Sequence, residues 1–242
     1  MNIIIYICKD LIVIHINMQT FRELVYMVMD ELKLYSDDSN FTEDHIIMLL
    51  VKYRAFLLKQ KYSDIRKTIP ESNYQDICLE LMEVPAIAGI PCEGGVFLKS
   101  KEKIPFLMTI GLKRVYTDSY YKGEITYITK DRMRYTGYNK YLTNIVYCSV
   151  GPDDYLYFKF SNEEFLETEN VHLYGIFQDC ARASELQCDK DCELIDRVFP
   201  LEDALVPTTI ELTLKELLGA AYRPEDKQND ASDDLSEVAV KK

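Results

Sequence analysis

Two periodicities divide the chain. Apolar residues recur at helical spacing over 20–35, over 42–61 and again over 207–223, whereas apolar and polar residues alternate in segments between about 75 and 180. A period near 3.6 is typical of amphipathic helices, and a period of two is typical of half-buried strands. The pattern predicts an α+β protein: a helical bundle, made of an N-terminal helical hairpin plus a C-terminal helix, with an inserted, mostly antiparallel β-module and an extended C-terminal tail.

The predicted helices carry signals at their ends. Thr20 and Glu23 form a T-x-x-E capping box before the first helix, and Thr42 is the expected N-cap of the second. In the last helix, Pro207 is expected at the first helical position, and a second T-x-x-E begins at Thr208. The first two helices cannot bury their wide apolar faces alone, so we expect the last helix to return and pack on them.

The middle of the chain supplies the strands. Four segments are predicted to be strands: 77–81, 124–129, 155–160 and 171–177. The whole chain is thus expected to comprise an apolar extension (1–17), a helical hairpin (18–70), a β-rich inserted module (71–198), a closing helix (199–223) and an acidic tail (224–242).

We expect that the apolar start is not a targeting sequence. Lys9 and Asp10 cut it into two short runs, and it lacks the basic region and small-residue cleavage site of a signal peptide. We interpret 1–17 as an extension upstream of a start at Met18. A strand that is buried or paired with a partner is the competing interpretation.

Composition argues for interaction rather than catalysis. The 242 residues are 48% hydrophobic and 28% charged, which is typical of globular proteins. There is no phosphate-binding glycine loop, no H-E-x-x-H and no G-x-S-x-G, and the three histidines are far apart in sequence. We therefore expect no enzyme activity, no cofactor and no metal.

The seven cysteines have irregular spacing, which indicates reduced thiols rather than a disulfide framework. Cys180, Cys188 and Cys192 could bind zinc, but their spacing is not that of a standard zinc knuckle and no fourth ligand is evident. Unliganded thiols are the preferred interpretation.

Charge is distributed unevenly. The net charge is -12, yet residues 99–140 hold ten Lys/Arg and four Asp/Glu, whereas residues 151–203 hold fourteen Asp/Glu and four Lys/Arg. Opposite regions of this kind could join copies of the chain head to tail. They could equally be two solvated faces without a partner.

Two groups of residues are candidate partner-binding sites. The first is a basic and aromatic stretch on the β-module, comprising Arg114, Tyr116, Tyr120, Tyr121, Arg132, Arg134, Tyr135, Tyr138 and Tyr141. Such residues bind single-stranded nucleic acid by stacking and neutralisation, or serve as hot spots of protein interfaces. In an acidic chain we favour the interface.

The second group lies on the closing helix and leads into the tail: Leu214, Leu217, Leu218, Tyr222 and Arg223. The alternative for Leu214 and Leu217 is that they pack inside the helical bundle and contact no partner.

Several of these stretches carry a family resemblance. Residues 21–32, 37–39 and 53–58, together with 199–207, 215–219 and 223–226, resemble structural proteins of crAss-like bacteriophages. More distantly, the layout is similar to the head-to-tail adaptor proteins of short-tailed phages, which form a ring beneath the portal.

The resemblance implies a virion structural protein, a head-tail connector subunit without catalytic activity. It would form a ring with copies of itself, dodecameric to match the portal protein, extend the DNA channel and dock further neck and tail proteins. DNA would pass through without sequence-specific binding, since an acidic lumen repels phosphate. The implied locations are the virion neck and, during assembly, the host bacterial cytoplasm, with no membrane contact. The alternative is a single-stranded nucleic-acid-binding accessory protein that uses the β-module.

Overall fold

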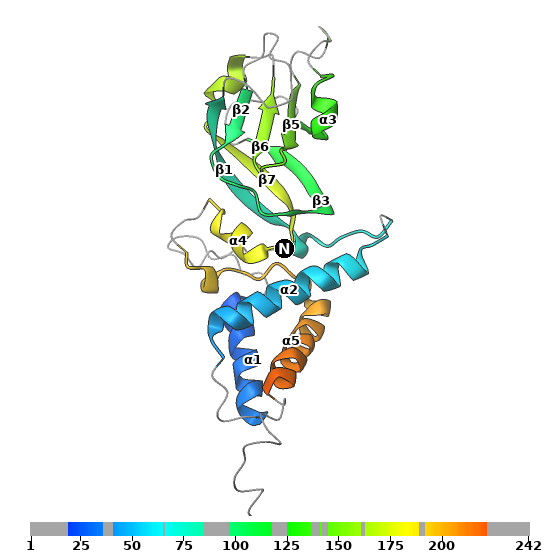
Figure 1. Ribbon diagram of the computed structural model, residues 1–242, viewed down its shortest axis with the longest axis vertical. Coiled ribbons are helices and arrows are strands. Elements are labelled where there is room, and N and C mark those ends of the chain that lie inside the picture. The colour runs from blue at the N-terminus through cyan, green and yellow to red at the C-terminus, as the bar shows by residue number, and fades with distance from the viewer. Residues whose placement is uncertain are drawn as a thin grey trace, which may run out of the picture.

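The three long helices and the β-module occupy opposite ends of an elongated molecule (Figure 1). The computed structural model describes residues 19–35, 41–64, 66–84, 97–117, 125–136, 141, 145–160, 163–188 and 192–221. The predicted extension 1–17 and tail 224–242 therefore lie outside the described residues. No helix in the described part combines the length and the apolarity needed to cross a bilayer.

The β-module is one curled sheet. Its seven strands are β1 (Gln75–Val84), β2 (Phe97–Ser100), β3 (Leu107–Tyr116), β4 (Ile125–Tyr127), β5 (Val146–Val150), β6 (Leu156–Lys159) and β7 (Asn170–Phe177), in the order β3-β7-β1-β2-β6-β5-β4. Only the β4–β5 pair is parallel among these strands. The strands at the two ends of the order, β3 and β4, contact each other, so the sheet curls toward a barrel around its apolar core.

All four predicted strands are present, and three strands were not predicted: β2, β3 and β5. β3 does not alternate cleanly because its pairing with β7 shifts register between Leu107 and Arg114. Gly111 lies in this irregular stretch, and a Cβ there would come within 2.7 Å of the Ile176 carbonyl oxygen. Only glycine allows so close an approach of the two backbones.

Three helices form the other end: α1 (Phe21–Tyr35), α2 (Glu43–Lys61) and α5 (Val206–Ala221). They share one core, in which Phe21 and Phe199 meet edge to face at 5.0 Å. Leu214 and Leu217 are buried in this core, so in the single chain they close the bundle. Figure 1 shows α2 lying across the ends of α1 and α5, a steeper crossing than a simple antiparallel hairpin would have.

The shorter helical elements are α3 (Lys130–Met133), α4 (Cys180–Glu185) and the 3-10 turns Glu71–Asn73, Glu163–Glu167, Leu194–Asp196 and Asp203–Leu205. The last two turns contact the helical end, through α1 and α5 respectively. The α+β class, with a helical bundle and a mostly antiparallel sheet, is confirmed.

The predicted caps of α1 and α2 are present. The Glu23 N–H donates to Thr20 Oγ1 at 3.2 Å, and the Thr20 N–H donates to Glu23 Oε2 at 3.0 Å, which completes the capping box. Thr42 caps α2 by accepting from the His45 N–H. The cap predicted at Thr208 is wrong, because the preceding 3-10 turn starts α5 at Val206 and places Thr208 within its first turn.

Replacing Thr20 by alanine is expected to lower the free energy of unfolding by about 1 kcal/mol, because one donor at the start of α1 loses its acceptor. Urea denaturation of the variant beside the parent chain measures this. Thr208→Ala is the matched control and should change stability by less than about 0.5 kcal/mol, since this exposed residue caps nothing. An equal loss in both variants would contradict the assignment of the cap.

Candidate assembly surfaces

A buried arginine joins the helical end to the β-module. The Arg54 side chain comes from α2 and is 0% exposed. Its Nε donates to the Pro200 carbonyl at 2.7 Å, Nη1 to the Phe177 carbonyl at 2.8 Å, and Nη2 to the Asn73 carbonyl at 3.0 Å. One guanidinium thus joins the end of β7, the turn before β1 and the segment that leads to α5. Burial lowers its pKa from the usual value, although an arginine remains charged.

Sequence reasoning missed this role. Arg54 lies four residues after Leu50 and eight after Ile46, on the same helical stripe, and both of those side chains are buried. A charged residue on an apolar stripe was the available signal, because it must be either exposed or fully hydrogen-bonded.

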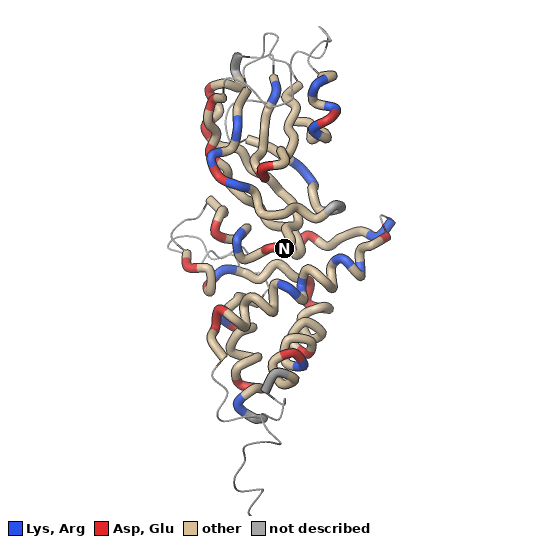
Figure 2. Tube along the Cα trace, in the orientation of Figure 1, with Lys and Arg blue, Asp and Glu red and all other residues tan. Residues whose placement is uncertain are grey.

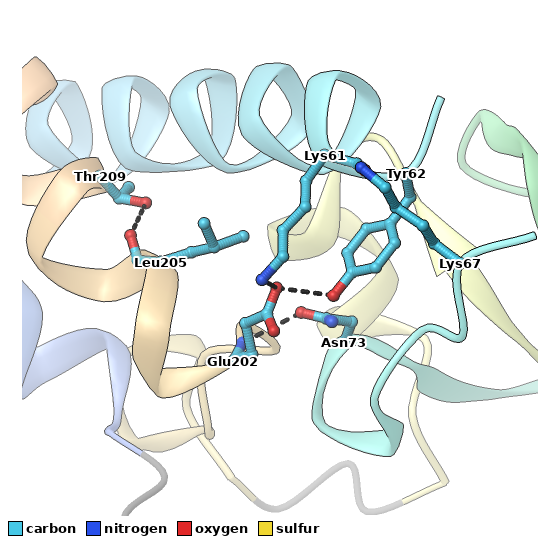
Figure 3. A network of polar contacts seen from close by, with 7 residues as sticks. All are labelled: Lys61, Tyr62, Lys67, Asn73, Glu202, Leu205 and Thr209. Carbon is cyan, nitrogen blue, oxygen red and sulfur yellow. Dashed lines mark hydrogen bonds and ion pairs between the residues drawn. The ribbon is translucent and has the colours of Figure 1, made fainter. Parts of the chain in front are cut away.

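A second network fixes the same joint (Figure 3). Glu202 Oε1 accepts from Lys61 Nζ at 2.9 Å and from the Tyr62 hydroxyl at 2.8 Å. The Glu202 N–H donates to Asn73 Oδ1 at 3.0 Å, which ties the same residue to the turn before β1. Burial and the Glu202 carboxylate together raise the pKa of Tyr62, so the phenol stays a donor. These contacts hold α2 and the segment before α5 in one position relative to the sheet.

A groove of about 1070 Å³ opens beside this joint, between α2 and the β-module. Three large apolar side chains lining it are more than half exposed: Met48 at 55%, Phe56 at 56% and Phe106 at 67%. Lys59 of α2 and Arg182 of α4 also line it, so charge surrounds the apolar surface. Exposed apolar surface with charged neighbours is typical of protein interaction sites.

The groove explains why α2 is apolar on more than one side. Its inner face, with Ile46, Leu50 and Leu58, belongs to the helical core. Phe56 does not belong to that face, because its exposed side chain lines the groove. The excess apolarity of α2 was the sequence signal for a second contact face.

The basic and aromatic stretch divides into two places. Arg114 and Tyr116 lie on β3, where the Arg114 guanidinium covers the rings of Tyr116 at 4.7 Å and Tyr174 at 5.3 Å. The Tyr116 hydroxyl donates to Asp76, and its ring stacks on His172 at 4.8 Å. These two residues are therefore engaged within the chain.

The remaining described members lie away from β3. Arg132 on α3 is exposed, as are the neighbouring Arg134 and Tyr135, and Tyr141 is 80% exposed. The other predicted residues, Tyr120, Tyr121, Tyr138, Tyr222 and Arg223, lie outside the described residues. Leu218 is half-buried on α5.

The opposite charge regions of the sequence do not form opposite faces. Basic β3 pairs with β7 and basic β2 pairs with β6, and both partners belong to the acidic region. Lys99 and Asp153 form an ion pair between the two regions at 3.4 Å. Figure 2 shows Lys/Arg and Asp/Glu interspersed along the β-module, so simple charge polarity does not describe this surface.

The zinc group considered from sequence is not assembled. Cys180 is buried beside the helical core, and no three-residue ligand group among the described residues contains it. Cys192 is in a disulfide, whereas Cys78, Cys148, Cys180 and Cys188 are thiols. The expectation of reduced cysteines therefore holds for these four but not for Cys192.

Comparison with known proteins defines the class of this chain: structural ring proteins of bacteriophage virions. Residues 23–235 match the family described as phage tail ring protein 2, and the chain belongs to this family. It is 60% identical over 223 residues to Ring protein 2 of Bacteroides phage crAss001. The aligned residues cover 90% of this chain and 99% of that relative. The resemblance to structural proteins of crAss-like phages is confirmed.

Proposed function

We propose that this ring protein is a head-tail connector subunit that assembles under the portal, extends the DNA channel and docks tail components. The family match over 23–235 is the observation that carries the proposal. A dodecamer would match the portal's symmetry, and the role is structural rather than enzymatic. The acidic net charge of -12 supports passage of DNA without capture, because like charges repel at long range.

The groove between α2 and the β-module is the contact we assign to the neighbouring subunit. A closed ring needs a heterologous interface, in which one surface of each copy meets a different surface of the next. Met48, Phe56 and Phe106 offer the kind of exposed side chains that bury well in such a contact. The Arg54 and Glu202 networks support this role, because they fix both walls of the groove relative to each other.

Quantitative mass spectrometry of gradient-purified virions tests the connector role. We expect about one copy of this chain per portal subunit, because matched rings share their copy number. A chain that is abundant in infected cells but absent from virions would overturn the proposal. The host cytoplasm would then be its only location.

Arg132 and Arg134 are expected to contribute to assembly through the exposed end of the module. Reversal of both charges, Arg132→Glu with Arg134→Glu, should impair incorporation into the virion while the monomer stays folded, because both residues are exposed. Circular dichroism and virion incorporation measure the two effects separately. Loss of folding would instead show that these residues support the module itself.

The salt dependence of binding distinguishes nucleic-acid binding by the β-module from contact between subunits. Phosphate contacts weaken linearly in log salt, whereas an apolar subunit contact changes little. Binding of a single-stranded oligonucleotide with a steep salt dependence, together with absence from virions, would favour the accessory role.

A further inference from the structure

Two cysteines and a histidine converge on one side of the sheet, away from the groove. Cys78 on β1 and His172 on β7 are directly opposed in the antiparallel pair, which places their side chains on the same face. Cys188 follows α4 and reaches the same place. The ligand atoms of these three residues lie within 4.8 Å of one another.

The approach of Cys188 is held by the backbone. The Cys78 N–H donates to the Leu186 carbonyl at 2.8 Å, which fixes the turn after α4 against β1 two residues before Cys188. Cys188 Sγ then lies 3.8 Å from His172 Nδ1 and 3.9 Å from Nε2. A tetrahedral zinc site has a sulfur-to-nitrogen edge of about 3.6 Å, so the distance from Cys188 Sγ to Nε2 is close to the length that such a site requires.

Asp76 completes the arrangement behind the histidine. Its Oδ1 atom is buried, has no hydrogen bond among the described residues, and lies 3.5 Å from His172 Nδ1. A carboxylate in this position favours the tautomer with the proton on Nδ1, so Nε2 is the nitrogen that would bind metal. Tyr116 donates to the same carboxylate and stacks on the imidazole, so it holds both groups in place.

We propose that Cys78, Cys188 and His172 bind one Zn²⁺ through two thiolates and Nε2, with Asp76 as the positioning residue. Cys188 is exposed, so water can take the fourth position. Both cysteines are thiols and neither is in a disulfide. The ion would fasten the turn after α4 to the sheet. This site does not depend on the connector role.

Titration of the reduced, metal-free full chain with Co²⁺ and then Zn²⁺ tests the proposal. We expect one Co²⁺ per chain, a sulfur-to-cobalt charge-transfer band, and its loss when Zn²⁺ displaces Co²⁺. Cys188→Ser should remove most of the band without unfolding the chain, since the residue is exposed. Asp76→Asn should weaken binding about 10-fold or more, because the imidazole loses its orienting carboxylate. Cys148→Ala is the control, since this thiol lies on β5 outside the group.

Zinc should also raise the midpoint of thermal unfolding of the parent chain and of Cys148→Ala, but not that of Cys188→Ser. The proposal fails if the reduced chain gives no charge-transfer band. It also fails if the band persists in the Cys78→Ser, Cys188→Ser double variant. Mass spectrometry could also find a Cys78–Cys188 disulfide in the protein purified under reducing conditions. The two cysteines would then be a redox pair, and the proposed metal site would be excluded.

Discussion

Replacing Arg54 by alanine is expected to lower the free energy of unfolding by about 3–5 kcal/mol, a large part of the stability of a typical domain. The guanidinium is 0% exposed and serves three carbonyls, those of Pro200, Phe177 and Asn73. Truncation leaves these acceptors buried without donors and opens a cavity. Urea denaturation measures the loss, and native-state hydrogen exchange should show the amides near Pro200 opening more readily.

Two further variants keep this result interpretable. Arg54→Lys retains the charge but lacks the planar guanidinium that donates in several directions. It should therefore retain only part of the stability that Arg54→Ala loses. Arg66→Ala removes an exposed arginine from the turn after α2 and should change stability by less than about 0.5 kcal/mol. A loss below about 1 kcal/mol in Arg54→Ala would show that the joint does not depend on the guanidinium.

Replacing Phe106 by aspartate is expected to abolish ring assembly while the monomer remains folded. The side chain is 67% exposed, so the isolated chain loses little apolar contact. In the assembled ring, a charge buried at the centre of an apolar contact should weaken each subunit interface by more than about 30-fold. Under the proposed connector role, cosedimentation with the portal measures assembly, because a portal ring would serve as the template if the free chain stays monomeric.

Comparison with two other surfaces locates the interface. Met82→Asp places the same charge on an exposed apolar residue of β1, which does not line the groove, and should leave assembly unchanged. Tyr135→Asp tests the exposed end of the module beside α3. Assembly that tolerates Phe106→Asp but not Tyr135→Asp would move the subunit contact from the groove to that end.

The candidate interface residues show how much of the surface could be predicted from the sequence. The exposed Arg132, Arg134 and Tyr135 were identified as candidates because basic and aromatic residues cluster there. The groove was not, because its walls come from α2, the segment before β3, and α4, and no local pattern connects them. Arg114 and Tyr116 belong to the same stretch of sequence, yet β7 and β1 supply the groups that engage them.

The sequence by itself determined the α+β class, the three long helices, the capping box at Thr20 and the cap at Thr42. These features depend on periodicity and on contacts within about four residues, which a single segment already contains. Only the tertiary structure decided the burial of Arg54, the placement of the two charge regions on paired strands, and the meeting of Cys78, His172 and Cys188. Each of these joins residues far apart in the chain, whose proximity is set by packing and strand register rather than by local preference.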